Sequence, residues 1–194
     1  QALVLPALLK GKSARVQAET GGGKTLAFLL PILCHRLATP QEEKSTFALI
    51  LTPTRELAIQ IAGVLEGLIS KRLSRITFSI LIGGTKRKVE QADLDKQPAI
   101  VIGTPGRVLD HMNTAHRWNY KHLSIFCIDE ADRVLDDGFE EQLNEIIGKI
   151  NTEKVTQVML FSATNDATKL ADLSKITANF SNIKLKTFST LQNK

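Results

Sequence analysis

The chain has 194 residues, of which 43% are hydrophobic and 23% charged, and it contains two cysteines. This length suits one domain with an adequate core, and the composition is that of an ordinary globular protein. Cys34 and Cys127 have no C-x-x-C partner, which argues against a zinc site or a disulfide framework but leaves a single bridge open. Their apolar surroundings predict two buried thiols in a reducing compartment. The net charge of +5 favours polyanionic partners only weakly, because a Lys-rich surface explains it equally well.

The sequence shows neither a membrane span nor a signal peptide. Its longest apolar run, from Leu26 to Cys34, is interrupted by Pro31 and is too short to cross a bilayer. The chain begins at Gln1 rather than at Met, so we expect a fragment of a longer protein, with one domain over residues 1–194.

Short apolar runs alternate with helical patterns along the whole chain. Strands are predicted at residues 14–18, 47–51, 77–81, 99–102, 123–128, 155–161 and 182–186, with helices between them, for example at 56–70 and 140–150. Residues 48–51 and 125–128 are apolar throughout, which is typical of central strands buried on both faces. The pattern predicts an α/β fold with a mainly parallel central sheet flanked by helices on both faces. Ligands of such a sheet bind beyond the carboxyl ends of its strands.

The first predicted strand leads into a Gly-rich loop and then into an apolar helix. The loop is a Walker A pattern with Ala in place of its first Gly, and it consists of Ala18, Glu19, Thr20, Gly21, Gly22, Gly23, Lys24 and Thr25. Glycines let backbone N–H groups converge on phosphate oxygens, and the amino end of the following helix adds positive charge. We expect Lys24 to contact the β- and γ-phosphates and Thr25 to bind Mg²⁺ through its hydroxyl. A dinucleotide-binding GxGxxG loop is disfavoured, because Leu26 occupies the position of its third Gly.

An acidic cluster follows the strand predicted at residues 123–128. Asp129, at the tip of this strand, is placed where a carboxylate holds Mg²⁺ beside a phosphate loop, partly through water. The adjacent Glu130 is suited to orient and deprotonate an attacking water, which a hydrolysing ATPase needs and a small-molecule kinase does not. The Asn-Lys-x-Asp signal for guanine does not occur, so ATP and ADP are favoured over guanine nucleotides. Lys24, Asp129 and Glu130 are therefore the predicted catalytic residues.

With further motifs in view, the chain resembles the DEAD-box family of ATP-dependent RNA helicases over nearly its whole length. Residues 129–132 read D-E-A-D, and the other family signatures stand in the expected order: P-T-R-E-L-A at 53–58, G-G at 83–84, T-P-G-R at 104–107 and S-A-T at 162–164. Gln1 precedes the phosphate loop by the interval that the adenine-reading Gln of the family keeps. The resemblance implies a RecA-like P-loop domain, the first of two helicase domains, with ATP, Mg²⁺ and RNA as ligands.

The same resemblance implies a role for each matching residue. Gln1 would read the adenine edge. Contacts with the RNA sugar-phosphate backbone fall to Pro53, Thr54, Arg55, Gly83, Gly84, Thr104, Pro105 and Arg107. Ser162 and Thr164 would hydrogen-bond the acidic cluster at Asp132 and couple nucleotide state to RNA binding. Because backbone contacts carry no base information, RNA binding is expected to be sequence-tolerant.

The chain also departs from the family pattern. Glu19 replaces the usual Gln and Gly22 replaces Ser or Thr, but neither change removes the phosphate lysine, so nucleotide binding is expected to survive. The second RecA-like domain, which brings the arginine fingers and half of the RNA channel, lies outside this chain, so the isolated domain is expected to be nearly inactive as an ATP hydrolase. The whole protein is expected to be a monomer without membrane association that unwinds short RNA duplexes or remodels ribonucleoproteins. Residues 133–161 and the Asp172-Leu173 region most resemble nucleolar, ribosome-assembly members, which favours the nucleus or nucleolus over the cytoplasm.

Three alternatives remain open at this stage. A DNA helicase or translocase of the same superfamily is opposed by the D-E-A-D spelling and by Gln1. A non-catalytic binding module is opposed by the presence of Lys24 and Glu130. A small-molecule kinase would need an arginine-rich lid, which is not evident. The four histidines, His35, His111, His116 and His122, show no metal-ligand spacing and are interpreted as surface or packing residues.

Overall fold

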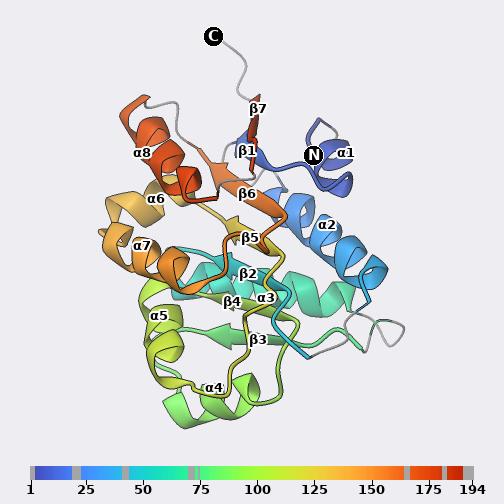
Figure 1. The fold of residues 1–194 in the computed structure, drawn as a ribbon, viewed down its shortest axis with the longest axis vertical. Coiled ribbons are helices and arrows are strands. Elements are labelled where there is room, and N and C mark those ends of the chain that lie inside the picture. The colour runs from blue at the N-terminus through green and yellow to red at the C-terminus, as the bar shows by residue number, and fades with distance from the viewer. Residues whose placement is uncertain are drawn as a thin grey trace.

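The computed structural model describes residues 3–18, 23–40, 44–69, 73, 75–163, 167–180 and 183–189. Helices and strands alternate along this part of the chain (Figure 1). The strands are β1 (Ala14–Gln17), β2 (Ala48–Leu51), β3 (Phe78–Leu81), β4 (Ile100–Gly103), β5 (Ile125–Ile128), β6 (Gln157–Ser162) and β7 (Lys186–Ser189). The helices are α1 (Leu5–Leu9), α2 (Lys24–Ala38), α3 (Arg55–Leu68), α4 (Arg87–Leu94), α5 (Pro105–Thr114), α6 (Ala131–Asp136), α7 (Glu140–Lys149) and α8 (Ala167–Ala178).

The strands of the described residues form one sheet in the order β3-β4-β2-β5-β6-β1-β7. Each pairing in this sheet is parallel, which confirms the predicted fold class. β2, β4, β5 and β6 are buried along their whole length, as the apolar runs indicated. Since the strands are parallel, the carboxyl ends of all of them lie at one edge of the sheet.

Two hydrophobic cores cover the two faces of the sheet. Alternate residues of one strand serve different cores: Ala48 and Ile50 of β2 belong to the core beneath α1, α2 and α3, whereas Leu49 and Leu51 face the other core. That second core is closed by α5, α6, α7 and α8, which lie on the opposite side of the sheet in Figure 1. Helices cover both faces of the sheet, so the side chains on both sides of a central strand are buried. This explains why polar and apolar residues do not alternate in the sequences of these strands.

Two details of the sequence-based prediction were wrong. The last strand was expected at residues 182–186, but β7 runs from Lys186 to Ser189 as a largely exposed strand beside β1. Ile183 and Leu185, which suggested the earlier start, pack against the second core instead. Cys34 was expected to be buried, but it lies on the exposed side of α2. Cys127 is buried, and both thiols are free.

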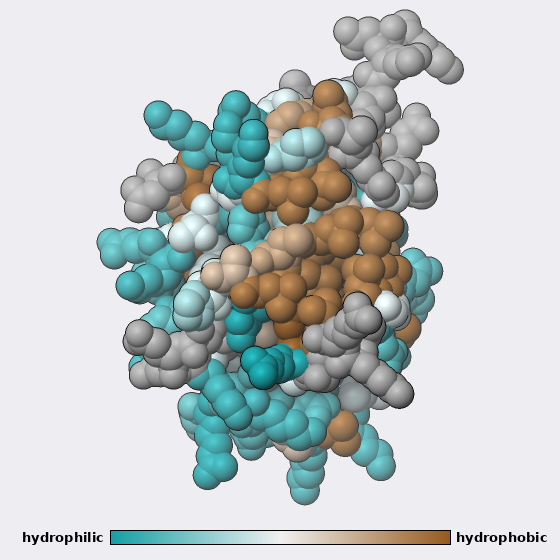
Figure 2. Space-filling model, turned by 90° about the vertical axis from the view of Figure 1, so that its right-hand side faces the viewer, coloured by the Kyte–Doolittle hydropathy of each residue, from teal (hydrophilic) through white to brown (hydrophobic). Residues whose placement is uncertain are grey.

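Hydrophobic side chains also gather on one part of the surface. Figure 2 views the molecule from the side that carries α1 and α2 in Figure 1, and brown residues cluster across it. The large hydrophobic residues exposed on α1, α2, α3 and the turn before α1 are Leu3, Leu9, Leu37, Ile59 and Val64. Exposed apolar residues are common on globular domains.

Candidate functional site

The predicted motifs follow six strands at one edge of the sheet, where the strand order sorts them into two groups. Asp129 and Ala18 follow the strands β5 and β1, and Ser162 ends the strand β6 between them; we call this group the lysine half because it contains Lys24. The segments that begin at Pro53, Gly83 and Thr104 follow the adjacent strands β2, β3 and β4, and we call this group the arginine half. The two halves meet between β2 and β5.

The phosphate loop lies at the end of β1 in the lysine half. Ala18 is buried, and its N–H donates to the carbonyl oxygen of Ser162 at 3.0 Å. Gly23 has a φ of 72°, a conformation that glycine adopts readily, and it caps α2, which begins at Lys24. Gln1, Glu19, Thr20, Gly21, Gly22 and Thr164 lie outside the described residues.

Lys24 is buried yet has no hydrogen-bond partner within the described part of the chain. Its side chain is held at the amino end of α2, and only 8% of the residue is exposed. A buried ammonium group without an acceptor is costly, so such a group calls for an anion. The amino end of a helix attracts the same kind of ligand. The position of Lys24 therefore fits a phosphate, and the half-buried hydroxyl of Thr25 follows it on the same helix.

Asp129 supplies the opposite charge in the lysine half. Its carboxylate is buried, and Oδ1 accepts a hydrogen bond from the Glu130 N–H at 3.0 Å. Burial raises the pKa of Asp129 from 3.8 to about 6, against the opposing effects of the Lys24 charge and of the Glu130 hydrogen bond. A buried carboxylate that titrates this high gains from a cation placed beside it. Asp129 is thus suited to bind a divalent metal.

Glu130 has an unusual backbone conformation. Its φ of 48° and ψ of 49° lie in the left-handed region, where it caps α6. Residues other than glycine adopt this region at a cost of order 1–2 kcal/mol, and such strain tends to occur at functional sites. The side chain is only 13% exposed, and Oε2 accepts a hydrogen bond from Arg133 Nη1 at 2.8 Å. The turn directs Glu130 away from the course of β5 and fixes its carboxylate beside α6.

The third acidic residue, Asp132, contacts the segment that follows β6. Its Oδ2 accepts a hydrogen bond from the Ala163 backbone N–H at 3.3 Å. The sequence assigns a link of this kind to the hydroxyls of Ser162 and Thr164, and the contact with Ala163 is made by the main chain between these two residues. Ser162 itself is buried. The acidic cluster and the S-A-T segment are therefore in contact, as the predicted coupling requires.

In the arginine half, Thr54 and Arg55 form the amino end of α3. The Thr54 hydroxyl caps this helix by accepting from the Leu57 N–H at 3.2 Å, and Pro53 is buried. The exposed Arg55 guanidinium lies over Gly84, whose φ is 87°; a Cβ atom added there would stand 2.6 Å from Nη2. No hydrogen bond or ion pair holds Arg55 among the described residues. Its guanidinium is therefore available to an anionic ligand.

Thr104 and Pro105 form the amino end of α5, and Arg107 lies in its first turn. The Thr104 N–H donates to the carbonyl oxygen of Leu81 at 3.1 Å, which joins the end of β4 to β3. Arg107 is 19% exposed, and its Nε donates to Glu90 Oε2 at 2.7 Å. The structure therefore places Arg107 beside the predicted RNA contacts but engages it with a buried carboxylate.

Sequence reasoning missed Glu90 and did not single out His111. Glu90 on α4 is 2% exposed, and His111 is fully buried with its Nε2 at 2.7 Å from Glu90 Oε2. Glu90 belongs to no recognised motif. The one available signal was the spacing of Arg107 and His111, four residues apart on one helix face, where both can contact the same partner.

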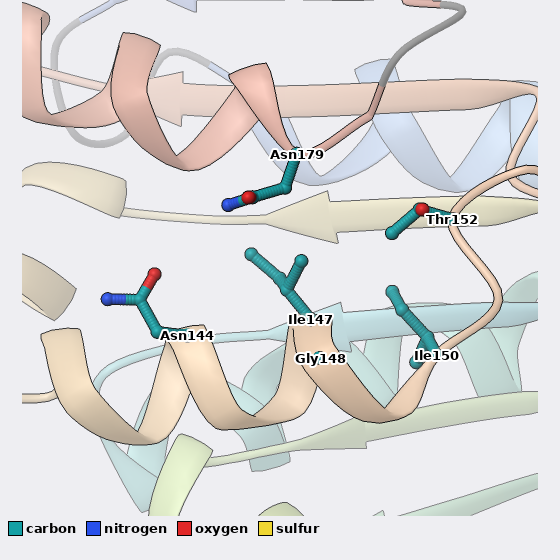
Figure 3. A pocket seen from close by; sticks show the side chains of 6 residues that line it. All are labelled: Asn144, Ile147, Gly148, Ile150, Thr152 and Asn179. Carbon is teal, nitrogen blue, oxygen red and sulfur yellow. The ribbon is translucent and has the colours of Figure 1, made fainter.

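A pocket of about 460 Å³ lies away from these motifs. It is lined by Asn144, Ile147, Gly148, Ile150, Thr152 and Asn179, from the ends of α7 and α8 and the loop after α7 (Figure 3). These segments lead into β6 and β7, at the edge where the strands begin. The pocket contains none of the predicted site residues and no charged side chain, so it does not define the candidate site.

The described residues contain no group of three or more His, Cys, Asp or Glu residues arranged to hold a metal ion. Mg²⁺ in nucleotide sites is commonly held by one or two protein oxygens together with phosphates and water. Asp129 and the Thr25 hydroxyl fit that pattern. In the same part of the chain, no helix has the length and apolar character needed to cross a membrane.

A parallel sheet with a buried lysine at a helix amino end and a buried aspartate two strands away defines a P-loop nucleotide-binding domain. Residues 1–173 match the family described as DEAD/DEAH box helicase, and the chain belongs to this family. It is 46% identical over 176 residues to the "Probable ATP-dependent RNA helicase ddx27" of Dictyostelium discoideum, covering 90% of this chain and 22% of that protein. It is 42% identical over 179 residues to the "ATP-dependent RNA helicase DRS1" of Lodderomyces elongisporus, covering 92% of this chain and 26% of that protein.

The fold agrees with solved structures of the same family. A structure of the DEAD-box helicase Mss116 "bound to ssRNA and UDP-BeF" superposes with a TM-score of 0.86 at 30% identity, covering 98% of this chain and 40% of that one. The described domain is therefore a RecA-like domain of the DEAD-box type. The chain spans about a quarter of the length of the two curated relatives, 22% and 26%.

Proposed function

We propose that this chain is the ATP-binding domain of an ATP-dependent RNA helicase and that it also contacts the RNA backbone. The observation that carries the proposal is the buried Lys24 ammonium, without a partner in the described part of the chain, in the same half of the site as the buried Asp129 carboxylate. Membership of the family and relatives named as ATP-dependent RNA helicases support it.

The lysine half would bind ATP or ADP. Lys24 would contact the β- and γ-phosphates, with backbone N–H groups of residues 18–25 around them, and Gln1 would read adenine. Thr25 and Asp129 would hold Mg²⁺, which neutralises phosphate charge when bound. Glu130 would accept a proton from the attacking water. A solved relative bound to the nucleotide analogue AMP-PNP supports nucleotide binding in this family.

The arginine half would bind single-stranded RNA through its sugar-phosphate backbone. The exposed Arg55 guanidinium, the Gly83-Gly84 turn and the amino ends of α3 and α5 offer positive charge and N–H donors at one edge of the sheet. The family structures described as bound to ssRNA support this ligand. Ser162, Thr164 and Asp132 would couple the two halves.

The nucleotide assignment is tested by the thermal stability of residues 1–194 with ADP and Mg²⁺. A ligand at a hundredfold its Kd adds about 2.7 kcal/mol, or roughly 5–10 °C in Tm for a domain of this size. Lys24→Ala should remove most of this shift, because it deletes a charge-assisted contact worth roughly 1.5–3 kcal/mol. The matched control is Lys121→Ala, an exposed lysine before β5, which should leave the shift unchanged. An equal shift in both variants would refute the role of Lys24.

We also propose that rapid hydrolysis and unwinding need a second RecA-like domain of the same protein. An arginine finger contributes roughly 10³–10⁵ in rate in comparable enzymes. The isolated chain should bind ATP and hydrolyse it slowly, and the full-length protein should show RNA-stimulated turnover that Glu130→Gln abolishes. Brisk RNA-stimulated hydrolysis by residues 1–194 alone would contradict this. Stimulation by DNA rather than by RNA would favour the DNA helicase alternative.

The setting of the protein is proposed from its resemblance to one branch of the family. Residues 133–161 resemble nucleolar, ribosome-assembly members, so we place the full-length protein, as a monomer, in that pathway. Colocalisation of the tagged full-length protein with a nucleolar marker tests this assignment, and a purely cytoplasmic distribution would contradict it.

A further inference from the structure

A buried carboxylate organises the arginine half. Glu90 lies in α4 with 2% of its side chain exposed, and its two oxygens accept hydrogen bonds from three directions. Oε1 accepts from the Ile82 backbone N–H at 2.9 Å, and Oε2 lies 2.7 Å from both Arg107 Nε and His111 Nε2. An ionised carboxylate can only accept, so His111 presents a protonated Nε2 to it. Glu90 thus joins α4 and α5 to the end of β3.

Arg107 continues the connection on the other side of the glycine turn. Its Nη2 donates to the Thr85 carbonyl oxygen at 2.8 Å, and its Nη1 lies 3.8 Å from Asp110 Oδ2. Ile82 immediately precedes Gly83-Gly84, and Thr85 immediately follows them. The Glu90–Arg107 pair therefore holds the main chain on both flanks of the turn.

We propose that Glu90 and Arg107 form a clamp that fixes the Gly83-Gly84 turn, and through Gly84 the Arg55 guanidinium, in the conformation that receives RNA. Arg107 is then a positioning residue rather than a direct phosphate contact. The inference rests on the proposed RNA binding. A two-glycine turn has more conformational freedom than other sequences, so fixing it before binding lowers the entropy lost when RNA binds.

The alternative is that Arg107 binds phosphate directly. Its guanidinium is 19% exposed and already donates to Glu90 and Thr85 in directions set by its planar fork. The substitution Arg107→Lys distinguishes a direct phosphate contact from a positioning role. Lysine retains the charge that a phosphate contact requires, but it has no planar fork to span a carboxylate and a carbonyl oxygen at once.

The test measures RNA and nucleotide binding by the full-length protein carrying Glu90→Gln, Arg107→Lys or both. Affinity for a labelled single-stranded oligouridylate is measured with AMP-PNP and Mg²⁺ at several salt concentrations, and nucleotide affinity is measured in parallel. The clamp predicts that each single variant binds RNA about tenfold or more weakly, because each breaks buried, charge-assisted hydrogen bonds. Nucleotide affinity should stay within about twofold of wild type, because the lysine half is untouched. The double variant should be no weaker than the single ones.

Matched control variants and the salt dependence of RNA binding show why the variants bind RNA more weakly. Asp93→Asn, on the exposed side of α4, and Arg117→Lys, exposed at the opposite edge of the sheet, should bind RNA like wild type. The clamp predicts that Arg107→Lys leaves the slope of log affinity against log salt unchanged. Wild-type RNA affinity in Arg107→Lys would overturn the clamp. The clamp would also be overturned if the slope of log RNA affinity against log salt fell by about 0.7 in Arg107→Gln, which is the change expected for one lost phosphate contact on a single strand.

Misfolding of a variant and failure of the proposed RNA binding can each be told apart from failure of the clamp. Should Glu90→Gln fail to fold, shown by loss of nucleotide binding as well, Arg107→Lys decides the question through the same outcomes. A wild-type protein that binds AMP-PNP but no RNA would overturn the proposed function, and the clamp with it. Wild-type RNA binding that both single variants retain would overturn the clamp alone.

Discussion

Replacing Asp129 by Asn should make the magnesium-free domain more stable while removing its metal site. Burial raises the pKa of Asp129 from 3.8 to about 6 in the folded state. Between these values the folded chain holds a proton that the unfolded chain has lost. Folding stability therefore falls as the pH rises through this window, and the loss is complete above about pH 6. Asn cannot ionise, so the variant lacks this loss.

The size of the effect follows from the same shift. A difference of roughly two pH units at 1.36 kcal/mol each gives about 3 kcal/mol. The value already includes the attraction of Lys24, because that charge opposes the rise in pKa. The Asn side-chain oxygen can still accept from the Glu130 N–H. We expect Asp129→Asn to be about 3 kcal/mol more stable at pH 7.5, roughly 6–12 °C in Tm, and equal to wild type near pH 4.

The assay is urea unfolding of residues 1–194 in EDTA, repeated across this pH range for wild type and variant. Asp137→Asn, which removes an exposed carboxylate at the end of α6, is the matched control and should change stability by less than about 0.5 kcal/mol. With ADP and Mg²⁺ the wild type should be more stable than Asp129→Asn, because the variant no longer gains stability from binding the nucleotide and the metal. A variant less stable than wild type at pH 7.5 without metal would refute the electrostatic reasoning.

Two further predictions concern the glycine turn and the thiols. Gly84→Ala should cost about 1 kcal/mol, since φ is 87° there, and should weaken RNA binding by displacing Arg55. Gly138→Ala, with a φ of 78° and no atom within 4 Å of the added Cβ, is the matched control and should leave RNA binding unchanged. Equal RNA affinities in the two variants would show that the packing of Arg55 on the turn is unimportant. Cys34 should react with a thiol reagent in the native protein, whereas Cys127 should react only on unfolding, because burial and a nearby carboxylate raise its pKa. Mass spectrometry after limited labelling distinguishes them, and early labelling of Cys127 would contradict its burial.

The fold was predictable because a strand that is buried on both faces has apolar residues at successive positions in the sequence. The apolar runs at 48–51 and 125–128 became β2 and β5, buried on both faces. The same logic failed for β7, since an exposed edge strand needs no apolar run. The apolar residues Ile183 and Leu185 serve the core beside it. The hydrophobic pattern therefore predicted the central strands correctly and the bounds of the edge strand β7 wrongly.

The candidate site was predictable as a set of residues but not as an arrangement. Each motif was expected after a strand, yet its neighbours depend on the strand order, which local sequence does not contain. The motifs interleave along the chain, and the structure separates them into the lysine and arginine halves. Glu90 was missed because its burial depends on Arg107, His111 and the end of β3, which come together only in the folded sheet.

At the sheet edge that carries both halves, backbone hydrogen bonds join the lysine half to the arginine half. Backbone bonds extend the ladder just past the strands, from Asp129 N–H to Leu51 O, from Thr52 N–H to Gly103 O, and from Thr104 N–H to Leu81 O. Asp129 is joined in this way to the end of β2, and β2 is joined through β4 to the end of β3. We expect a change at the nucleotide to reach the RNA contacts along this ladder and through the strained Glu130 turn and the Asp132–Ala163 contact, both at the start of α6. A second domain that closes over this edge would act on the same groups.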